Sequence, residues 1–339
     1  LKMMNAESNK KDLHVSSLHK GDAVSEKEGG AGANAVGQKR GLKDWFVATR
    51  PWSFPASVVP VLVVAAWLFW QSSTVGGYVT DWWCAPLALL MLVLMQASGN
   101  LIGDYYDHIR GIDLPGSLNG VRHIQSGMFQ PREILRFGYV LLALAVLLGI
   151  VILMRCGWQA AWLGVAGVLL VVSYPWLKAH ALGDFDILLG YALLPALGVA
   201  YAVGGSWMWQ PVALILPVGL LTVSILHANN TRDILNDMRA GIVTLSIRMG
   251  GRTAQRAYVV QNALSYLLVP IFILCGLLPL VAMITWLTLP LAISNARTML
   301  KAKPLAEEPI ALLDQRTAQT QMAFGLLYAL SFLLATWIA

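Results

Sequence analysis

Apolar runs of about 20 residues recur from residue 53 to the C-terminal end, and they constrain the fold more than any other feature of the sequence. A helix of about 20 residues crosses the roughly 30 Å hydrocarbon core of a bilayer. Its backbone polar groups are then satisfied internally, as that environment requires. We therefore predict an all-α, polytopic membrane protein with nine transmembrane helices. They are expected at approximately residues 53–71, 84–103, 134–154, 158–177, 185–204, 211–231, 257–276, 279–297 and 319–338.

Composition supports this class and excludes others. Hydrophobic residues make up 57% of the chain and charged residues 12%, about half of the charged fraction of soluble domains. A soluble protein so poor in charge could not cover its surface. The net charge of +6 does not indicate a nucleic-acid partner, because nine of the 24 Lys and Arg precede residue 51 and nearly all others lie between apolar runs. The expected environment is the lipid bilayer.

The first 43 residues are rich in Lys, Glu, Gly, Ser and Ala and contain no apolar run. Such a segment cannot bury enough apolar surface to offset the entropy of ordering it. We therefore predict a disordered tail at residues 1–43 and one transmembrane domain at residues 44–339. The tail, the loops after every second helix and the helix ends next to these loops hold 23 of the 24 Lys and Arg residues. By the positive-inside rule the N-terminus is cytoplasmic and the C-terminus lies outside.

Two groups of acidic and amide residues close predicted helices on this cytoplasmic side. Asn100, Asp104 and Asp107 end the second helix at spacings of four and three, so they share one face. Intramembrane carboxylates cost about 2.5–3.5 kcal/mol each on insertion scales and are functional candidates by default. The first group is therefore a short ladder of oxygen ligands.

A second ladder closes the sixth helix. Asn229, Asp233 and Asp237 step by four along one face, and Asn230 adds a neighbouring amide. Two facing ladders of like charge would repel each other unless cations lay between them. Oxygen ligands of this kind suit Mg²⁺, which binds one or two carboxylates together with substrate phosphates. The alternative is that both ladders are solvated caps at the membrane surface.

Cationic residues on the same side indicate an anionic substrate. Arg122 and Lys178 each lie in a loop leading to a helix beside an acidic group, and Arg232 lies within the second ladder. Cationic side chains with Mg²⁺ form the usual clamp for phosphate oxygens. The residues that we assign to binding the phosphate oxygens of this substrate are Asn100, Arg122, Lys178, Asn229, Asn230 and Arg232.

These residues closely resemble the UbiA superfamily of intramembrane aromatic prenyltransferases across residues 44–339. Within it, the chain is most similar to the MenA branch, the 1,4-dihydroxy-2-naphthoate polyprenyltransferases. The motifs that carry this likeness are Arg50-Pro-Trp-Ser-Phe, Asp104-Tyr-Tyr-Asp107, Leu182-Gly-Asp184, Asn229-Asn-Thr-Arg-Asp233 with Asp237, Ala240-Gly-Ile-Val-Thr-Leu and Gln315-Arg-Thr-Ala. One position departs from the branch, because Gly103 stands where Asn is usual; Asn100, one turn earlier, is the candidate replacement.

The resemblance implies a nine-helix bundle that uses Mg²⁺. Asp104 and Asp107 would hold one ion and Asp233 and Asp237 the other, both bound to the diphosphate of a polyprenyl donor. The cationic residues would neutralise the remaining charge. The acceptor would be 1,4-dihydroxy-2-naphthoate, whose carboxylate leaves as CO₂ to give demethylmenaquinone. Asp184 is the candidate base, and a bacterial plasma membrane is the expected location.

Three alternatives remain open at this stage. A prenyltransferase of the same fold could use another acceptor, such as 4-hydroxybenzoate, homogentisate or a tetrapyrrole. A membrane transporter also carries intramembrane acids, although near the bilayer midplane rather than at helix ends. A sensor of isoprenoid diphosphates would bind the same donor without turnover.

Overall fold

The computed structural model describes residues 40–76, 80–111 and 123–338, and nearly all of them are helical. These residues form no β-strand apart from one isolated bridge. The all-α class is therefore confirmed. The predicted tail lies outside the described residues except for its last four, and the first helix already begins among them, at Leu42.

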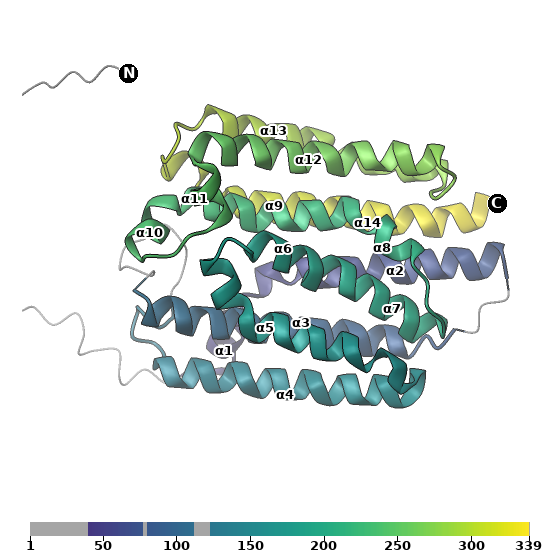
Figure 1. Ribbon diagram of the computed structural model, residues 1–339. Coiled ribbons are helices and arrows are strands. Elements are labelled where there is room, and N and C mark those ends of the chain that lie inside the picture. The colour runs from purple at the N-terminus through teal and green to yellow at the C-terminus, as the bar shows by residue number, and fades with distance from the viewer. Residues whose placement is uncertain (1–39, 77–79, 112–122, 339) are drawn as a thin grey trace, which may run out of the picture. The chain divides into compact units, whose positions relative to one another are not determined.

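The long helices run alongside one another, with α10 and α11 at one end and the C-terminus at the other (Figure 1). Short 3₁₀ turns and one π-helical turn, η3, connect or interrupt them. In chain order the elements are α1 (Leu42–Ala48), η1 (Pro51–Ser53), α2 (Pro55–Thr74), α3 (Cys84–Ile109), α4 (Pro131–Cys156), η2 (Trp158–Ala160), α5 (Ala161–Ala179), α6 (Gly183–Leu188), η3 (Leu189–Leu193), α7 (Leu194–Gly204), α8 (Gln210–Leu214), α9 (Leu216–Arg232), α10 (Ile234–Arg239), α11 (Leu245–Met249), α12 (Gly251–Leu274), η4 (Leu280–Thr288), α13 (Leu289–Lys301), η5 (Glu308–Ile310) and α14 (Leu313–Ile338).

Eight helical segments of the described chain are long and apolar enough to cross a membrane, so the predicted count of nine is not confirmed. The missing one is the predicted span 211–231. There the structure has α8 and α9, separated at Ile215 just before Pro217. Proline lacks the backbone N–H that would continue the hydrogen-bond ladder of a preceding helix. What remains as α9 is 17 residues long, the lower limit for crossing the hydrocarbon core.

The environment of α9 explains its low hydropathy. It packs against α12 and α14, and both α6 and α11 also contact it. Most of its residues are buried, among them His227, Asn230 and Arg232. A helix surrounded by protein can carry such side chains without exposing them to lipid. α9 is therefore a central helix of the bundle, although it is shorter and less apolar than the eight segments that can cross a membrane.

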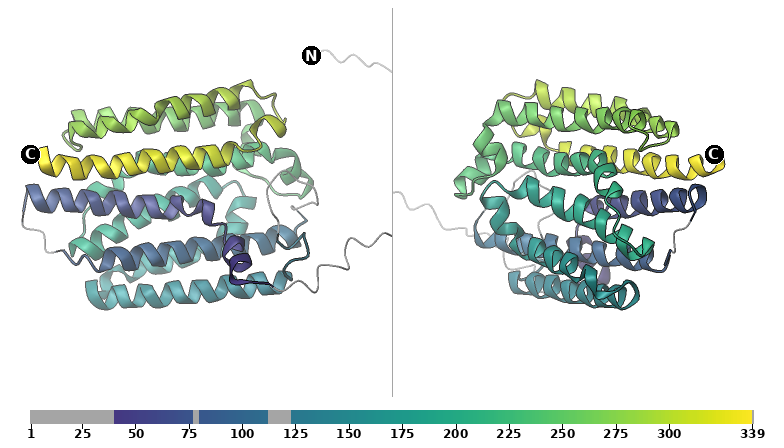
Figure 2. Two further views of the ribbon diagram at one scale, coloured as in Figure 1. Left: turned by 180° about the vertical axis from the view of Figure 1, so that it is seen from behind. Right: turned by 45° about the vertical axis from the view of Figure 1, so that its right-hand side comes forward.

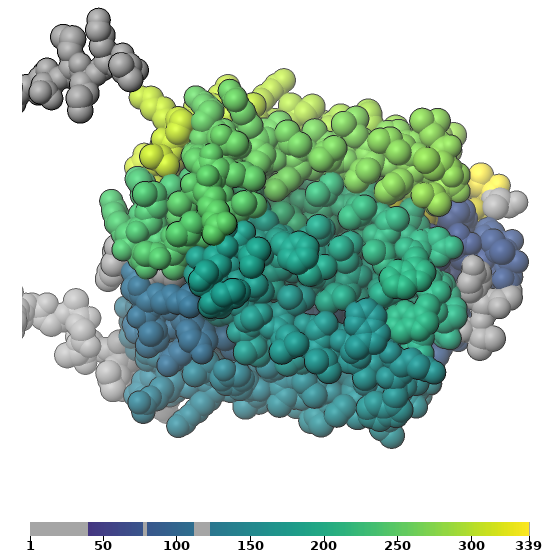
Figure 3. Space-filling view, in the orientation of Figure 1, coloured from purple at the N-terminus to yellow at the C-terminus, as the bar shows by residue number. Residues whose placement is uncertain are grey.

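The apolar surface of the bundle is typical of a membrane protein. On α4, Leu147 and Met154 are 58% and 72% exposed, and on α5 Leu169 is 62% exposed. Figure 3 shows one face, on which teal side chains of the middle of the chain lie beside green ones of its last third. Exposing so many large apolar side chains to water would cost free energy, whereas in a bilayer the same side chains contact lipid tails. The chain is an integral membrane protein.

Asp81 and Arg155 are the only charged residues of the loops predicted to lie outside, and they bind each other. Arg155 Nε lies 2.7 Å from Asp81 Oδ2. The hydrogen bond from Arg155 holds the pKa of Asp81 below its ordinary value. The backbone N–H of Asp81 also donates to Val203 O, which ties this loop to the end of α7.

A glycine lets α14 pack closely on α2. The two helices lie side by side in both views of Figure 2 and are in contact. A Cβ placed on Gly325 would lie 2.0 Å from Cγ1 of Val59, well inside van der Waals contact. Small residues at such positions allow membrane helices to approach each other.

Replacing this glycine should loosen the α2–α14 contact. We expect Gly325→Ala to destabilise the protein by about 1–3 kcal/mol, as overpacking of a close contact does, and to lower the midpoint of thermal unfolding in detergent. Gly164→Ala is the matched control, because a Cβ at that helical position has no neighbour within 4 Å. Adding Val59→Ala to the Gly325 variant should recover part of the loss. Equal midpoints for the two single variants would contradict this packing.

Candidate active site

One cavity of about 1290 Å³ runs through the bundle among α2, α3, α4, α5, α7, α9 and α14. Its charged residues come from helix ends that meet at one end of the bundle, such as Asp107 near the end of α3 and Lys178 near the end of α5. Its apolar lining comes from the opposite ends of the same helices, as at Ala88 and Leu163. The cavity thus joins a polar mouth to a long apolar tunnel.

The first ladder lies on the last turns of α3. Asn100, Asp104 and Asp107 all line the cavity, as their helical spacing predicts. Asp104 forms an ion pair with Arg50, which comes from the turn before α2. Asp107 Oδ2 lies 3.3 Å from Lys178 Nζ of α5. Each carboxylate is therefore held by a cation from a different part of the chain.

The second ladder lies where α9 ends and α10 begins. Asn229, Asp233 and Asp237 line the same cavity as the first ladder. Asp233 is the residue between the two helices, and Asp237 lies in the first turn of α10. The structure thus brings the two predicted aspartate pairs together around one space.

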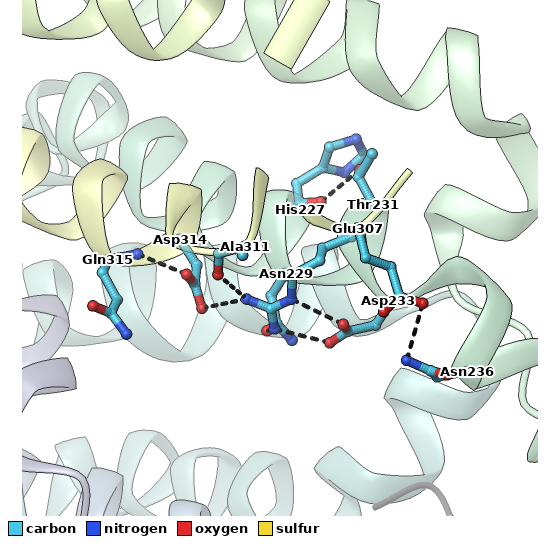
Figure 4. A network of polar contacts seen from close by, with 10 residues as sticks. His227, Asn229, Thr231, Asp233, Asn236, Glu307, Ala311, Asp314 and Gln315 are labelled. Atoms are coloured by element: carbon cyan, nitrogen blue, oxygen red, sulfur yellow. Dashed lines mark hydrogen bonds and ion pairs between the residues drawn. The ribbon is translucent and has the colours of Figure 1, made fainter. Parts of the chain in front are cut away.

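Arg232 holds the second ladder in place. Its Nε and one terminal nitrogen both donate to Asp233, at 2.9 Å each, and its other terminal nitrogen donates to Ala311 O at 3.0 Å. That nitrogen also lies 3.1 Å from Asp314 Oδ2 of α14. Figure 4 shows Asp233, Asn229, Ala311 and Asp314 gathered around this network. Because Arg232 is only 4% exposed and fully engaged, its first role is to position Asp233.

Asp237 is the most deeply buried of the four aspartates. It is 1% exposed, and its Oδ2 has no hydrogen-bond partner among the residues that the structure describes. Burial raises the pKa of Asp237 to about 7; Lys178 opposes this rise, whereas Asp233 and Asp107 add to it. An unpartnered carboxylate oxygen inside a cavity is a ready ligand for a cation.

Arg50 is a site residue that sequence reasoning did not assign. Its backbone is left-handed, with φ of 57°, directly before Pro51, a conformation that costs free energy in a residue with a side chain. The amide of Asn100 fixes this turn by donating to Thr49 O at 2.9 Å and Ser53 Oγ at 3.0 Å. Both N–H groups of Asn100 are thereby used, so only its Oδ1 can serve a ligand in the cavity. The sequence feature that could have identified Arg50 as a site residue is the Arg50-Pro51 pair before the first predicted span.

Several predicted residues are placed elsewhere. Arg122 lies outside the described residues. Asn230 is 2% exposed and is not part of the cavity lining, because it lies on another face of α9 than Asn229. Asp184, the candidate base, does not line the cavity either: its Oδ2 lies 2.7 Å from His227 Nδ1. The other ring nitrogen of His227 lies 3.0 Å from Ala254 O, so this pair ties α6, α9 and α12 together.

The donor set fits magnesium ions that also bind phosphate. The described lining contains six carboxylates against three cationic side chains, a formal charge of −3 with all groups ionised. Such a site cannot accept a diphosphate anion unless cations accompany it. No three acidic, His or Cys residues of the described ranges close around a single point. Mg²⁺ needs only one or two carboxylates per ion and completes its octahedron with water and phosphate oxygens.

Comparison with known proteins agrees with this fold. The chain matches the UbiA prenyltransferase family over residues 57–313. It is 33% identical to "UbiA prenyltransferase domain-containing protein 1" of Mus musculus over 299 residues, 86% of this chain and 84% of that protein. It is 29% identical to the 1,4-dihydroxy-2-naphthoate octaprenyltransferase of Escherichia coli K12 over 313 residues, 87% of this chain and 96% of that protein.

A solved structure has the same fold. A UbiA homologue from Archaeoglobus fulgidus, bound to GPP and Mg²⁺, aligns with a TM-score of 0.56 at 17% identity, covering 84% of this chain and 99% of that one. The family match places this bundle in the class of intramembrane prenyltransferases. The chain belongs to the UbiA prenyltransferase family.

The pKa of Asp237 predicts how Mg²⁺ binding depends on pH. Mg²⁺ requires the ionised carboxylate, so the ion and a proton compete for Asp237. Because the folded-state pKa is about 7, we expect Mg²⁺ affinity in the presence of geranyl thiodiphosphate, an unreactive donor analogue, to be constant well above pH 7. Below pH 7 it should fall by about tenfold per pH unit.

Calorimetry between pH 6 and 8.5 measures this dependence, in buffers of different ionisation enthalpy so that released protons are counted. Titrating Mg²⁺ into the thiodiphosphate alone corrects for protons that the ligand itself releases. An affinity that stays constant to pH 6 after this correction would contradict the placement of a cation at Asp237.

Proposed function

We propose that this protein is a Mg²⁺-dependent prenyltransferase that transfers a polyprenyl group from polyprenyl diphosphate to 1,4-dihydroxy-2-naphthoate. The products would be demethylmenaquinol, which is the reduced form of demethylmenaquinone, together with CO₂ and pyrophosphate. The observation that carries the proposal is the meeting of two aspartate pairs, Asp104 with Asp107 and Asp233 with Asp237, at the mouth of one apolar cavity. The likeness to the E. coli 1,4-dihydroxy-2-naphthoate octaprenyltransferase supports this acceptor.

The geometry explains how the donor would be held. Asp104 and Asp107 would hold one Mg²⁺, and Asp233 and Asp237 the other. Bound there, the ions would neutralise diphosphate oxygens and so make pyrophosphate a better leaving group. Lys178 lies between the ladders, since its charge acts on Asp107, Asp233 and Asp237, and it would donate to the same anion.

The apolar tunnel would hold the prenyl chain and exclude water. Residues of α4, α5 and α7 line it, for example Ile150, Val168 and Leu194. When the bond between the allylic carbon and the diphosphate oxygen breaks, the electron pair leaves with pyrophosphate and the carbon becomes electron-poor. A dry, apolar wall prevents water from capturing that carbon. Tyr174 and Tyr191 also line the cavity, and aromatic rings stabilise a nearby positive charge.

The new bond would form between the allylic carbon and the ring carbon that carries the acceptor's carboxylate. That carboxylate leaves as CO₂ and returns its bonding electron pair to the ring, so no base needs to remove a ring proton in this step. This chemistry agrees with the position of Asp184 away from the cavity. A related enzyme for 4-hydroxybenzoate, homogentisate or a tetrapyrrole would share the donor site and differ only in the acceptor.

An acceptor assay tests the proposal. Purified protein in lipid vesicles should form a prenylated naphthoquinol from farnesyl diphosphate and 1,4-dihydroxy-2-naphthoate only when Mg²⁺ is present, and this product is detected as the quinone after oxidation by air. In competition it should prefer this acceptor to 4-hydroxybenzoate and homogentisate. Preference for another acceptor would shift the assignment within the family. Donor binding without turnover of any acceptor would favour a sensor.

Each of the four site aspartates should be required for turnover. We expect Asp104→Asn, Asp107→Asn, Asp233→Asn and Asp237→Asn each to lower kcat by about 10²–10³-fold, the effect of removing one strong electrostatic stabiliser of a transition state. Asp81→Asn is the matched control, because Asp81 pairs with Arg155 and does not line the cavity; it should keep near-normal activity. Normal turnover in any of the four site variants would overturn the metal assignment.

We also propose that the aspartate-bearing end faces the cytoplasm of a bacterial plasma membrane, with the C-terminus outside. The distribution of Lys and Arg supports this orientation. Cys275 follows α12 on the predicted outer side and is exposed, whereas Cys84 is buried. A membrane-impermeant thiol reagent added to intact cells should therefore label Cys275. Labelling of Cys275 only after the cells are opened would reverse the orientation.

A further inference from the structure

Asp186 is a buried carboxylate that donor binding does not use. It lies on α6, is 4% exposed and lines the cavity. Its Oδ1 is buried without a hydrogen-bond partner, and within residues 40–76, 80–111 and 123–338 its side chain takes part in no hydrogen bond or ion pair. The sequence-based site did not include it.

Such a carboxylate is costly unless something binds it. Taking a carboxyl group out of water without a hydrogen-bonding partner costs several kcal/mol. Asp184, two residues earlier on the same short helix, shows the usual solution: it is buried, is paired with His227, and lies away from the cavity. Asp186 has no such partner and lies on the cavity. Its partner is therefore expected among the molecules that enter this space.

The chemistry of the surroundings narrows the partner. The three cationic side chains in the described part of the cavity lining, Arg50, Lys178 and Arg232, are each paired with an aspartate of the two ladders. A diphosphate or a carboxylate would be repelled by Asp186. A hydroxyl group can donate a hydrogen bond to it, and this bond is stronger when the acceptor oxygen is ionised.

Aromatic side chains and a wide helical turn make room for a flat ligand here. Tyr174 and Tyr191 line the same cavity and lie within electrostatic range of Asp186. The π-helical turn η3 begins three residues after Asp186. It contains Gly190, which also lines the cavity and, being glycine, has no side chain that would fill it. Single π-helical turns occur frequently at functional sites. An aromatic ring can therefore lie beside the carboxylate.

We propose that Asp186 binds a hydroxyl group of the aromatic acceptor. This inference rests on the proposed function and deepens it by naming the acceptor's contact. The carboxylate accepts a hydrogen bond from a ring hydroxyl and so holds the ring in place for attack on the allylic carbon. Because Asp186 repels a carboxylate, it contacts the 4-hydroxyl group, which is remote from the acceptor's carboxylate, and that carboxylate points away from α6. Asp186 would thus set both the affinity for the acceptor and its orientation.

Binding measurements on Asp186→Leu and Asp186→Asn test this role. The full-length variants are titrated with 1,4-dihydroxy-2-naphthoate in the presence of Mg²⁺ and geranyl thiodiphosphate. We expect the acceptor Kd to rise at least tenfold for Asp186→Leu and less for Asp186→Asn, while the Kd of the thiodiphosphate stays within twofold. Thermal stability should be unchanged or higher, because the substitution removes an unpaired buried carboxylate.

Two monohydroxy analogues identify the group that is bound. Wild type and Asp186→Leu should bind 1-hydroxy-2-naphthoate equally, since this analogue lacks the 4-hydroxyl group that Asp186 contacts. For 4-hydroxy-2-naphthoate, which keeps that group, Asp186→Leu should bind more weakly than wild type. Asp184→Asn is the matched control: the same change on the same helix should lower stability, because it breaks the contact with His227, and leave the acceptor Kd within threefold.

Three results would overturn the assignment. They are an unchanged acceptor Kd in Asp186→Leu, a parallel loss of acceptor and thiodiphosphate binding, and failure of both Asp186 variants to fold. The proposed function fails separately: wild type would then bind the thiodiphosphate with Mg²⁺ but bind no aromatic acceptor. If wild type binds the naphthoate and Asp186→Leu binds it equally well, only the role of Asp186 is wrong.

Discussion

The repulsion among carboxylates at the polar end of an apolar bundle is the constraint on which this structure depends. Asp104, Asp107, Asp233 and Asp237 line one cavity whose described charged groups sum to −3. Such an excess of one sign is unfavourable near a low-dielectric interior, where charges interact more strongly than in water. The fold tolerates it by pairing part of the charge internally, and the remaining excess of negative charge favours the cation binding that we propose.

The internal pairing is distributed over the whole chain. Arg50 comes from the turn before α2, Lys178 from the end of α5, and Asp314, which shares Arg232 with Asp233, from the start of α14. Each contact fixes one carboxylate and also ties two distant helices together at the mouth of the cavity. Stability at this end of the bundle and the geometry of the site therefore have the same physical source.

Much of the site could be predicted from the sequence because it depends on local spacing. Asn100, Asp104 and Asp107 share a helical face by their separation alone, and the structure places all three on the cavity. The spacing rule did not predict the position of Asn230. This residue is buried inside the bundle, and its burial depends on the packing of α12 and α14 against α9. The number of spans could not be predicted for a similar reason. The break before Pro217 shortens α9, and its burial among other helices allows polar residues on it, so eight segments of the described chain rather than nine are long and apolar enough to cross a membrane.

The sequence patterns could not predict contacts between residues that lie far apart in the chain. The pair Arg50–Asp104 joins residues 54 positions apart, and no periodicity links them. Asp184 and Asp186 lie in one short motif, yet one is paired with His227 away from the cavity while the other lies unpaired on it. Only the three-dimensional arrangement separates the structural carboxylate from the one available to a ligand.

The most direct test of the central idea is to count and locate the divalent ions with Mn²⁺ in place of Mg²⁺, using electron paramagnetic resonance and geranyl thiodiphosphate. The account predicts two Mn²⁺ ions per chain, bound only together with the thiodiphosphate and close enough for their spins to couple. Asp107→Asn and Asp237→Asn should each abolish the coupling. Mn²⁺ binding that neither needs the diphosphate nor changes with either aspartate would contradict the account.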